Sequence, residues 1–246
     1  MKKHNWQISL GIILIIMSFI VYLIHYIIFR DPHHIFIYLI GDIAFVFIEV
    51  LMVTLVIHSI LNIREKRERL EKLNMLIGVF FSEVGTRLLV LFSDSDPNLE
   101  KIKKKLIVNP EWTKNEFQHM NNQLRNYEYK INIDMINLKD LRDFLMKKSD
   151  FLVRLLENPN LLEHESFTEV LRSVFHIVEE LEHRKNIKQL SKNDSNHLAN
   201  DIKRGYNLLV FEWLNYIKHL KDNYPYLFSL AIRLNPFDEN ATADIK

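Results

Sequence analysis

Two long apolar runs near the start of the chain limit its possible folds more than any other feature. The first extends from Ile8 to Phe29 and the second from about Ile35 to Leu61. As a helix, each is long enough to span a hydrocarbon core of about 30 Å. Only three basic and three acidic residues precede residue 62, so residues 62–246 hold 29 of the 32 basic and 28 of the 31 acidic side chains. The sequence therefore predicts a two-helix transmembrane hairpin over residues 1–61, with helices at about 8–29 and 35–61, followed by a cytosolic domain.

The first apolar run could also belong to a signal peptide, because the basic start "MKKHN" is typical of one. The run is longer than the apolar core of a signal peptide, and its end, "HYIIFR", offers no cleavage site of small residues. We expect a retained helix, followed by a turn at "RDPHH" in which Pro32 prevents simple continuation of the helix.

The distribution of basic residues predicts the orientation of the hairpin. Lys2 and Lys3 precede the first run, and four basic residues follow the second, namely Arg64, Lys66, Arg67 and Arg69. The turn between the runs has Arg30 alone, offset by Asp31. The positive-inside rule then predicts a multi-pass protein of the plasma (inner) membrane with both termini cytoplasmic. The four basic residues are expected at the membrane surface, where they could also contact anionic headgroups.

Two carboxylates interrupt the second apolar run. Asp42 and Glu49 are seven residues apart, which places them on one helix face within about 20° of each other. Tyr38 shares that face, and three polar residues of the first run fall within a comparable arc. The predicted polar stripe consists of Asp42, Glu49, Tyr38, Ser18, Tyr22 and His25. A hairpin of two helices cannot hide this stripe from lipid, so the sequence predicts a homo-oligomer in which the stripe faces a shared axis.

The stripe has two interpretations. Ionisable residues inside a membrane usually face a cavity or an ion or proton path, and a ring of Asp42 and Glu49 side chains would favour cations. Alternatively, both acids are protonated and hydrogen-bonded to Tyr22, Ser18 or His25, which would hold the helices together. The first interpretation predicts a small cation or proton channel, and the second predicts a membrane-anchored interaction or signalling scaffold.

The composition excludes several other classes of function. The chain has no cysteine and therefore no disulfide, thiolate nucleophile or Cys-ligated metal. None of its five glycines forms a phosphate-binding loop, and the charged part is almost neutral, which does not indicate nucleic-acid binding. We expect no enzyme activity and no cofactor, with the lipid bilayer, further copies of the chain and an unidentified cytosolic protein as partners.

The sequence predicts an all-α bundle over residues 62–238, followed by a disordered tail over residues 239–246. The second helix is expected to continue into it, with a core face at Leu70, Leu73, Ile77, Phe80, Val84 and Leu91. Predicted helix starts are Asp96 with Pro97, the capping boxes Thr113/Glu116 and Ser166/Glu169, and the N-caps Asn137 and Ser195. A long helix is expected at about His197 to Lys221, and a last helix between Pro225 and Pro236.

Two Glu-x-x-His pairs suggest a third hypothesis, a helical-bundle metalloenzyme. The pairs are Glu116/His119 and Glu180/His183, and Glu83 and Glu212 could supply further carboxylates. With 18 Glu and 11 His in 246 residues, about 0.8 such pairs arise by chance. We therefore expect no metal at these pairs, and we expect His176 to be a core or helix-contact residue.

Three segments carry a family resemblance. The stretches "IFIYLIGDIAFVFIEVLMVTLVI" and "REKRERLEKLNMLIGVFFSEVG", with the closing "YPYLFSLAIRLNPFD", resemble a family of uncharacterised prokaryotic membrane proteins with two transmembrane helices and a helical cytosolic domain. The resemblance covers most of the chain. It implies a plasma-membrane location and identifies no functional residue.

Overall fold

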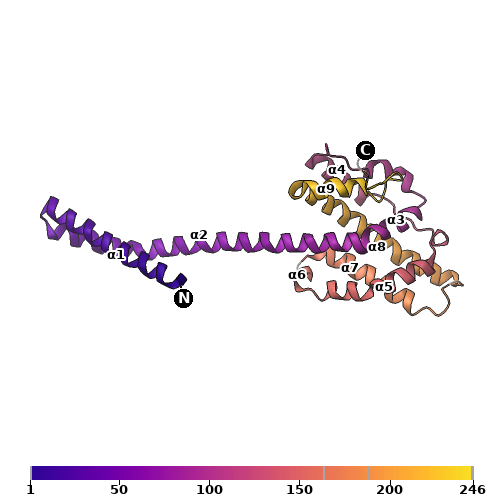
Figure 1. The fold of residues 1–246 in the computed structure, drawn as a ribbon, viewed down its shortest axis with the longest axis horizontal. Coiled ribbons are helices and arrows are strands. Elements are labelled where there is room, and N and C mark those ends of the chain that lie inside the picture. The colour runs from indigo at the N-terminus through magenta and orange to yellow at the C-terminus, as the bar shows by residue number, and fades with distance from the viewer. Residues whose placement is uncertain (1, 163, 188, 245–246) are drawn as a thin grey trace. The chain divides into compact units, whose positions relative to one another are not determined.

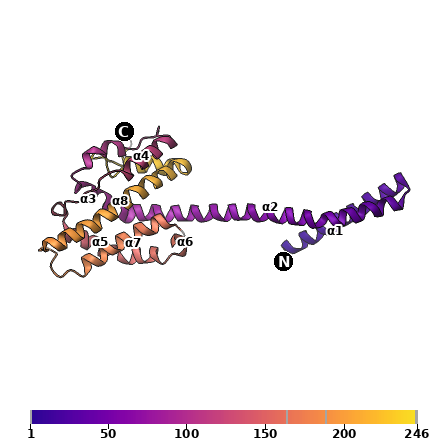
Figure 2. The same cartoon turned by 180° about the vertical axis from the view of Figure 1, so that it is seen from behind.

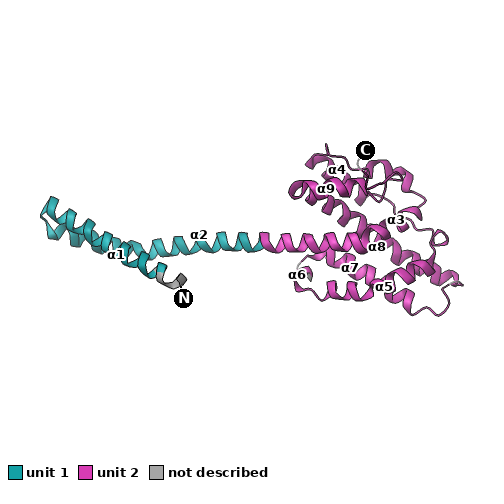
Figure 3. Cartoon of the chain, viewed as in Figure 1, with its two compact units in different colours: residues 1–66 teal, residues 67–246 magenta. Residues whose placement is uncertain are grey.

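The chain folds into helices that belong to two compact units. The computed structural model describes residues 2–162, 164–187 and 189–244, and its units comprise residues 1–66 and 67–246 (Figure 3). Within the described residues, all regular secondary structure is helical and no strand occurs. The all-α prediction is therefore confirmed.

The N-terminal unit contains α1 (Lys2–Phe29) and the first part of α2 (Pro32–Phe80), which Figure 1 labels. Arg30 has φ 50°, a left-handed conformation that ends α1. The Asp31 carboxylate accepts hydrogen bonds from the backbone N–H groups of His33 at 2.9 Å and His34 at 3.3 Å. Pro32 occupies the first turn of α2, where its missing N–H costs nothing. The predicted turn is present, and α2 begins three residues earlier than expected.

The apolar side chains of this unit are exposed. Among residue 6 and residues 8–66, only Gly11, His25, Ile35 and Leu39 are half-buried, and all others are exposed. By length and composition alone, α1 from Ile8 and the apolar part of α2 are long enough to cross a membrane, and none of either apolar stretch is buried. The apolar side chains of these two stretches are therefore not covered by the rest of the described chain.

The second helix runs on into the C-terminal unit, as predicted, and ends in a wide turn. A π-helical turn, η1 (Phe81–Gly85), separates α2 from α3 (Thr86–Asp94), and the Thr86 N–H donates to the Phe81 carbonyl. Gly85 permits this turn, because a Cβ there would lie 2.6 Å from the Phe81 ring and 2.8 Å from the Phe80 ring.

The wide turn changes the helix face that enters the core. Leu73, Ile77, Phe80 and Val84 are buried as predicted, but the extra residue in the turn moves the following core positions. Leu88, Leu89 and Phe92 are the buried apolar residues of α3, whereas Leu91 is half-buried, so the expected core position Leu91 was wrong. Leu70 precedes the turn and is exposed, so this expected core position was also wrong.

The remaining elements complete the C-terminal unit. They are η2 (Leu99–Lys101), η3 (Lys103–Leu106), α4 (Lys114–Arg125), η4 (Ile133–Met135), α5 (Leu138–Leu156), α6 (Pro159–Leu162), α7 (Glu165–Glu182), α8 (Lys192–Asn223) and α9 (Pro225–Arg233). The helix predicted to open at Asp96 and Pro97 is instead the two short 3₁₀ segments η2 and η3. Asp96 is buried, and its carboxylate accepts hydrogen bonds from the Asn98 N–H and the Tyr127 hydroxyl at 2.9 and 2.7 Å.

Two of the four predicted capping sites are confirmed. Thr113 and Glu116 form the complete capping box of α4, and the Asn137 side chain caps α5. The other two predictions were wrong. His164 caps α7 while the Ser166 hydroxyl donates to Glu212 at 2.9 Å, and α8 is capped by Ser191 in place of Ser195.

The core of the C-terminal unit lies between α5, α7, α8 and the end of α2. Helices α5, α7 and α8 lie side by side in both views of the molecule (Figures 1 and 2). The Phe80 ring at the end of α2 packs edge-on against Phe167 of α7, with 5.2 Å between centroids. Helices α7 and α8 approach closely at Gly205, where a Cβ would lie 3.1 Å from the Ile177 side chain.

The chain end packs against this unit, where the sequence predicted a disordered tail. The Thr242 N–H donates to the Arg233 carbonyl at 3.1 Å, and Glu239 forms an ion pair with Lys103. Buried Phe237 packs against Trp213 of α8. Within the predicted tail over residues 239–246, Glu239 and Thr242 thus have contacts with the rest of the unit, and residues 245 and 246 lie outside the described residues.

Candidate functional site

The two carboxylates of the polar stripe are exposed on α2. Asp42 and Glu49 lie within one continuous helix, so their spacing of seven residues places them on one face, two turns apart. Over the described parts of the chain, neither carboxylate has a hydrogen bond or ion pair. Their hydrogen-bonding capacity is not used within one chain.

The hydrogen bonds expected across the hairpin are absent from the described residues. Ser18 is exposed, and the Tyr22 side chain is 37% exposed on α1. No hydrogen bond joins either residue to Asp42 or Glu49. A single chain thus leaves the stripe open, as far as the structure describes it.

The structure connects His25 and Tyr38 through a residue that the sequence analysis missed. The rings of His25 and His34 stack with 5.7 Å between centroids, and His34 lies 4.6 Å from the Tyr38 ring. Phe29 packs against both histidines. The His25 Nε2 is buried without a hydrogen-bond partner. The i,i+4 spacing of His34 and Tyr38 beside the turn was the signal that could have identified this cluster.

The basic residues predicted at the membrane surface lie together on α2. Arg64, Lys66, Arg67 and Arg69 are all exposed in one continuous stretch of helix. The Arg67 Nε lies 3.3 Å from Glu71, one turn further along. This stretch is a solvated, charged segment of α2.

The first Glu-x-x-His pair has a structural role. The Glu116 carboxylate accepts a hydrogen bond from the Thr113 N–H, and this bond, with the Thr113 side chain, lowers the pKa of Glu116 below its ordinary value. His119 is exposed and lies 2.7 Å from the Gln123 amide nitrogen. No potential metal cluster found among the described residues includes this pair.

The second pair is separated in the structure. The His183 Nδ1 lies 2.9 Å from the carbonyl of Glu179, whereas Glu180 forms an ion pair with Arg184. His183 is exposed at the end of α7. Glu180 therefore does not share a site with the histidine three residues later.

The two further carboxylates proposed for such a site also have other partners. Glu83 accepts a hydrogen bond from Lys148 at 2.6 Å at the surface. Glu212 is 4% exposed and accepts a hydrogen bond from Ser166. Burial raises the pKa of Glu212, while the Ser166 hydrogen bond and nearby His164 oppose the shift. Neither residue belongs to the potential metal cluster found among the described residues.

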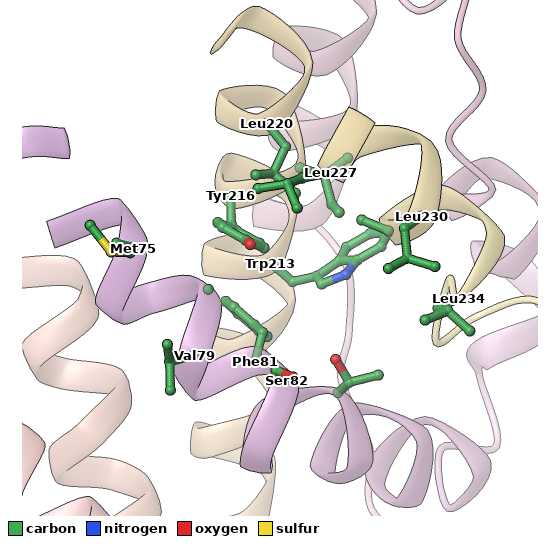
Figure 4. Close-up of a pocket in the computed structure, with 14 residues that line it drawn as sticks. Met75, Val79, Phe81, Ser82, Trp213, Tyr216, Leu220, Leu227, Leu230 and Leu234 are labelled. Carbon is green, nitrogen blue, oxygen red and sulfur yellow. The ribbon is translucent and has the colours of Figure 1, made fainter. Parts of the chain in front are cut away.

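An apolar groove lies on the C-terminal unit between α8, α9 and the end of α2. Figure 4 shows Trp213 and Tyr216 of α8 beside Phe81, with Leu227 and Leu230 of α9 along another side. The Phe81 and Tyr216 rings stack with 5.5 Å between centroids. The groove has a volume of about 440 Å³ and an apolar lining, which suits an apolar ligand or chain segment more than a charged one.

A cluster on α7 and α8 brings together residues that the sequence analysis did not connect. His176 and Glu180 come from α7, and His197 and Asp201 come from α8. Each helix supplies a histidine and a carboxylate four residues apart. This spacing places both side chains on one helix face and can be recognised in the sequence. The sequence could not show that the two pairs face each other.

Two family models match the chain. The model described as "MJ1433, N-terminal helical domain" matches residues 2–61, and that described as "Uncharacterized protein MJ1433, C-terminal helical domain" matches residues 69–233. A relative described as "Uncharacterized protein MJ1433", from Methanocaldococcus jannaschii, is 46% identical over 241 residues, which cover 98% of this chain and 97% of the relative. No solved structure matches the chain. The chain therefore belongs to the MJ1433 family, whose members combine an N-terminal and a C-terminal helical domain.

Proposed function

We propose that the chain is an integral membrane protein whose N-terminal unit spans the plasma membrane as a hairpin. The exposed apolar side chains of α1 and α2 support this proposal, because a soluble monomer rarely leaves so large an apolar surface in contact with water. The apolar residues between Ile35 and Ile57 favour insertion by about 5–10 kcal/mol, against about 5–7 kcal/mol for two central acids. The balance favours insertion of α2, and the acid-free α1 adds to it.

The proposed activity is passage of cations or protons through a homo-oligomer. The observation that carries it is that Asp42 and Glu49 lie on one face of α2 with no partner among the described residues of their own chain. A charged or protonated carboxylate facing lipid is costly, so this face requires a polar surrounding. A shared axis between several copies provides that surrounding and creates a ring of carboxylates that favours cations.

The flux experiment uses the full chain in liposomes. We expect the wild type to pass cations, and we expect the Asp42→Asn, Glu49→Gln double variant to lose flux at least about tenfold or to change selectivity. Both changes keep hydrogen-bonding capacity, so the oligomer should persist. The control variant is Glu65→Gln, Glu68→Gln, which removes two acids from α2 beyond the apolar stretch. A wild type that passes no ion over a range of voltage, tension and pH would refute the channel proposal.

The orientation is tested by cysteine labelling. The chain contains no cysteine, so single cysteines at Asp31 and Asn62 report position without background. An impermeant thiol reagent should label position 31 from outside the cell and position 62 only after the membrane is opened. The opposite pattern would contradict the positive-inside assignment of both termini to the cytoplasm.

A membrane-anchored interaction scaffold is the second candidate, and the apolar groove favours it. In this case an apolar segment of a partner protein would cover Trp213, Leu227 and Leu230, and the acids of α2 would act only in helix association. The flux experiment separates the two candidates. A stable oligomer without conduction supports the scaffold.

A further inference from the structure

Four side chains with metal-binding groups meet between α7 and α8. His176 and Glu180 lie one turn apart on α7, and His197 and Asp201 lie one turn apart on α8. One ligand atom from each residue can be chosen so that all four atoms lie within 4.8 Å of one another. The two helices are packed along each other, so a bound ion would join them.

The distances between neighbouring ligand atoms agree with a tetrahedral site. Asp201 Oδ2 lies 3.3 Å from His197 Nε2 and 3.6 Å from His176 Nε2. Glu180 Oε2 lies 3.7 Å from His197 Nε2, and Glu180 Oε1 lies 3.9 Å from His176 Nε2. Bonds of about 2.0–2.1 Å to a tetrahedral zinc ion place neighbouring ligand atoms about 3.3 Å apart. Small side-chain rotations would bring all four to that separation.

The buried carboxylate of Asp201 gives an independent indication of a missing ligand. Asp201 is 5% exposed, and its Oδ2 is buried without a hydrogen-bond partner. Arg204 donates to the other oxygen, Oδ1, at 3.1 Å and thereby orients the carboxylate with Oδ2 toward the histidines. A buried carboxylate oxygen without a hydrogen bond is costly, and a bound cation would remove that cost.

The second carboxylate is held beside the histidines by an arginine. Arg184 donates a hydrogen bond to Glu180 Oε2 and forms an ion pair with it. Glu180 Oε1 lies on the side of His176, 3.9 Å from its Nε2.

We propose that His176, Glu180, His197 and Asp201 bind one divalent transition-metal ion that clamps α7 to α8. Two imidazoles with two carboxylates suit Zn²⁺ and other first-row ions, and they do not suit Mg²⁺ or Ca²⁺, which prefer oxygen ligands alone. With four protein ligands, the ion has a structural role. The site is separate from the Asp42 and Glu49 stripe and does not depend on ion conduction.

A salt-bridge cluster without metal is the competing explanation. In it, both histidines are protonated, and Arg184 and Arg204 share the neutralisation of Glu180 and Asp201. Such a cluster would bind no zinc at stoichiometric amounts. Metal titration therefore separates the two explanations.

The test is titration of the full chain with zinc. The chain is purified in mild detergent without a histidine tag, stripped with a chelator, and titrated calorimetrically with Zn²⁺ and separately with Mg²⁺. We expect one Zn²⁺ per chain with micromolar or tighter affinity, no comparable Mg²⁺ binding, and a rise of about 5–10 °C in melting temperature at a hundredfold excess over the dissociation constant.

The variants locate the ion. We expect His176→Ala and His197→Ala each to weaken Zn²⁺ binding at least about tenfold and to abolish the thermal shift. His197 is more than half exposed, so its replacement should leave the fold intact, as circular dichroism would verify. The control is His119→Ala, His183→Ala, which removes two exposed histidines and should bind zinc as the wild type does. A wild type without stoichiometric zinc, or zinc binding that persists in the His176→Ala, His197→Ala chain, would overturn the proposal.

Discussion

Replacement of Phe80 by alanine is expected to destabilise the C-terminal unit by about 3–5 kcal/mol. Phe80 is completely buried at the end of α2, where its ring contacts Phe167 of α7 and Phe81 of the π turn. Truncation removes a large apolar side chain and leaves a cavity in a region that Gly85 keeps closely packed. The expected loss is a large part of the total stability of an ordinary domain.

Thermal unfolding of the full chain in mild detergent, followed by near-ultraviolet circular dichroism, would measure this change. For a unit of this size, the melting temperature should fall by roughly 6–20 °C. The control is Tyr226→Ala, which removes an aromatic ring that is 72% exposed on α9 and should change stability by less than about 0.5 kcal/mol. Equal melting temperatures for the Phe80 variant and the wild type would contradict the described packing of α2 against α7.

Replacement of Glu212 by glutamine is expected to stabilise the protein at neutral pH and to have little effect near pH 4. Burial raises the pKa of Glu212 above its ordinary value of 4.5, although the Ser166 hydrogen bond and His164 reduce the shift. Because the pKa of Glu212 is raised in the folded state, the contribution of this residue to stability is complete below pH 4.5. That contribution is lost as the pH rises through the folded-state pKa. Above that pH the folded protein contains a buried charge, which glutamine avoids.

The gain from Glu212→Gln should therefore grow with pH, by about 1.4 kcal/mol for each pKa unit of the shift. Melting temperatures of wild type and variant from pH 4 to pH 8 would measure it, with Glu111→Gln as a control for the loss of one exposed carboxylate. Glutamine can still accept the hydrogen bond from Ser166, so packing should be retained. A variant that is less stable than the wild type at pH 8 would show that the ionised carboxylate has a stabilising partner.

Periodicity and turn chemistry predicted most of the helices. The predicted core face of α2 is buried at Leu73, Ile77 and Phe80, because helical spacing alone places such residues on one side. The capping box at Thr113 was found because its hydrogen bonds are local in sequence. Pro225 likewise marked the first turn of α9.

Features that depend on distant residues were missed. Ser166 matches a capping box by sequence, but Glu212, forty-six residues away, takes its hydroxyl hydrogen bond. Helix α7 begins instead after His164, whose ring accepts from the Phe167 N–H. The cluster of His176 and Asp201 also depends on how α7 and α8 pack, which no spacing within either helix can specify.

The candidate polar stripe could be predicted from the sequence only in part. The shared face of Asp42 and Glu49 follows from helix geometry alone. The ring contacts that join His25 and Tyr38 require His34, whose position depends on the turn at Arg30 and Asp31. What the stripe faces in the assembled protein stays a prediction, and the flux and oligomer measurements test it.

The π turn after α2 has a consequence for changes in chain length. Each residue of an α-helix turns the side-chain direction by about 100°, and a π turn spreads nearly the same rotation over one more residue. The surplus residue within Phe81–Gly85 therefore moves the later core positions by one in sequence, while the side chains that follow keep their direction in space. Deleting one residue within this turn should return it to an ordinary helical turn and leave Leu88, Leu89 and Phe92 in the core. A one-residue deletion in the buried part of α2 before the turn has no surplus residue to absorb the loss. Descendants of this gene should therefore lose a single residue within Phe81–Gly85 more readily than elsewhere in the buried parts of α2 and α3.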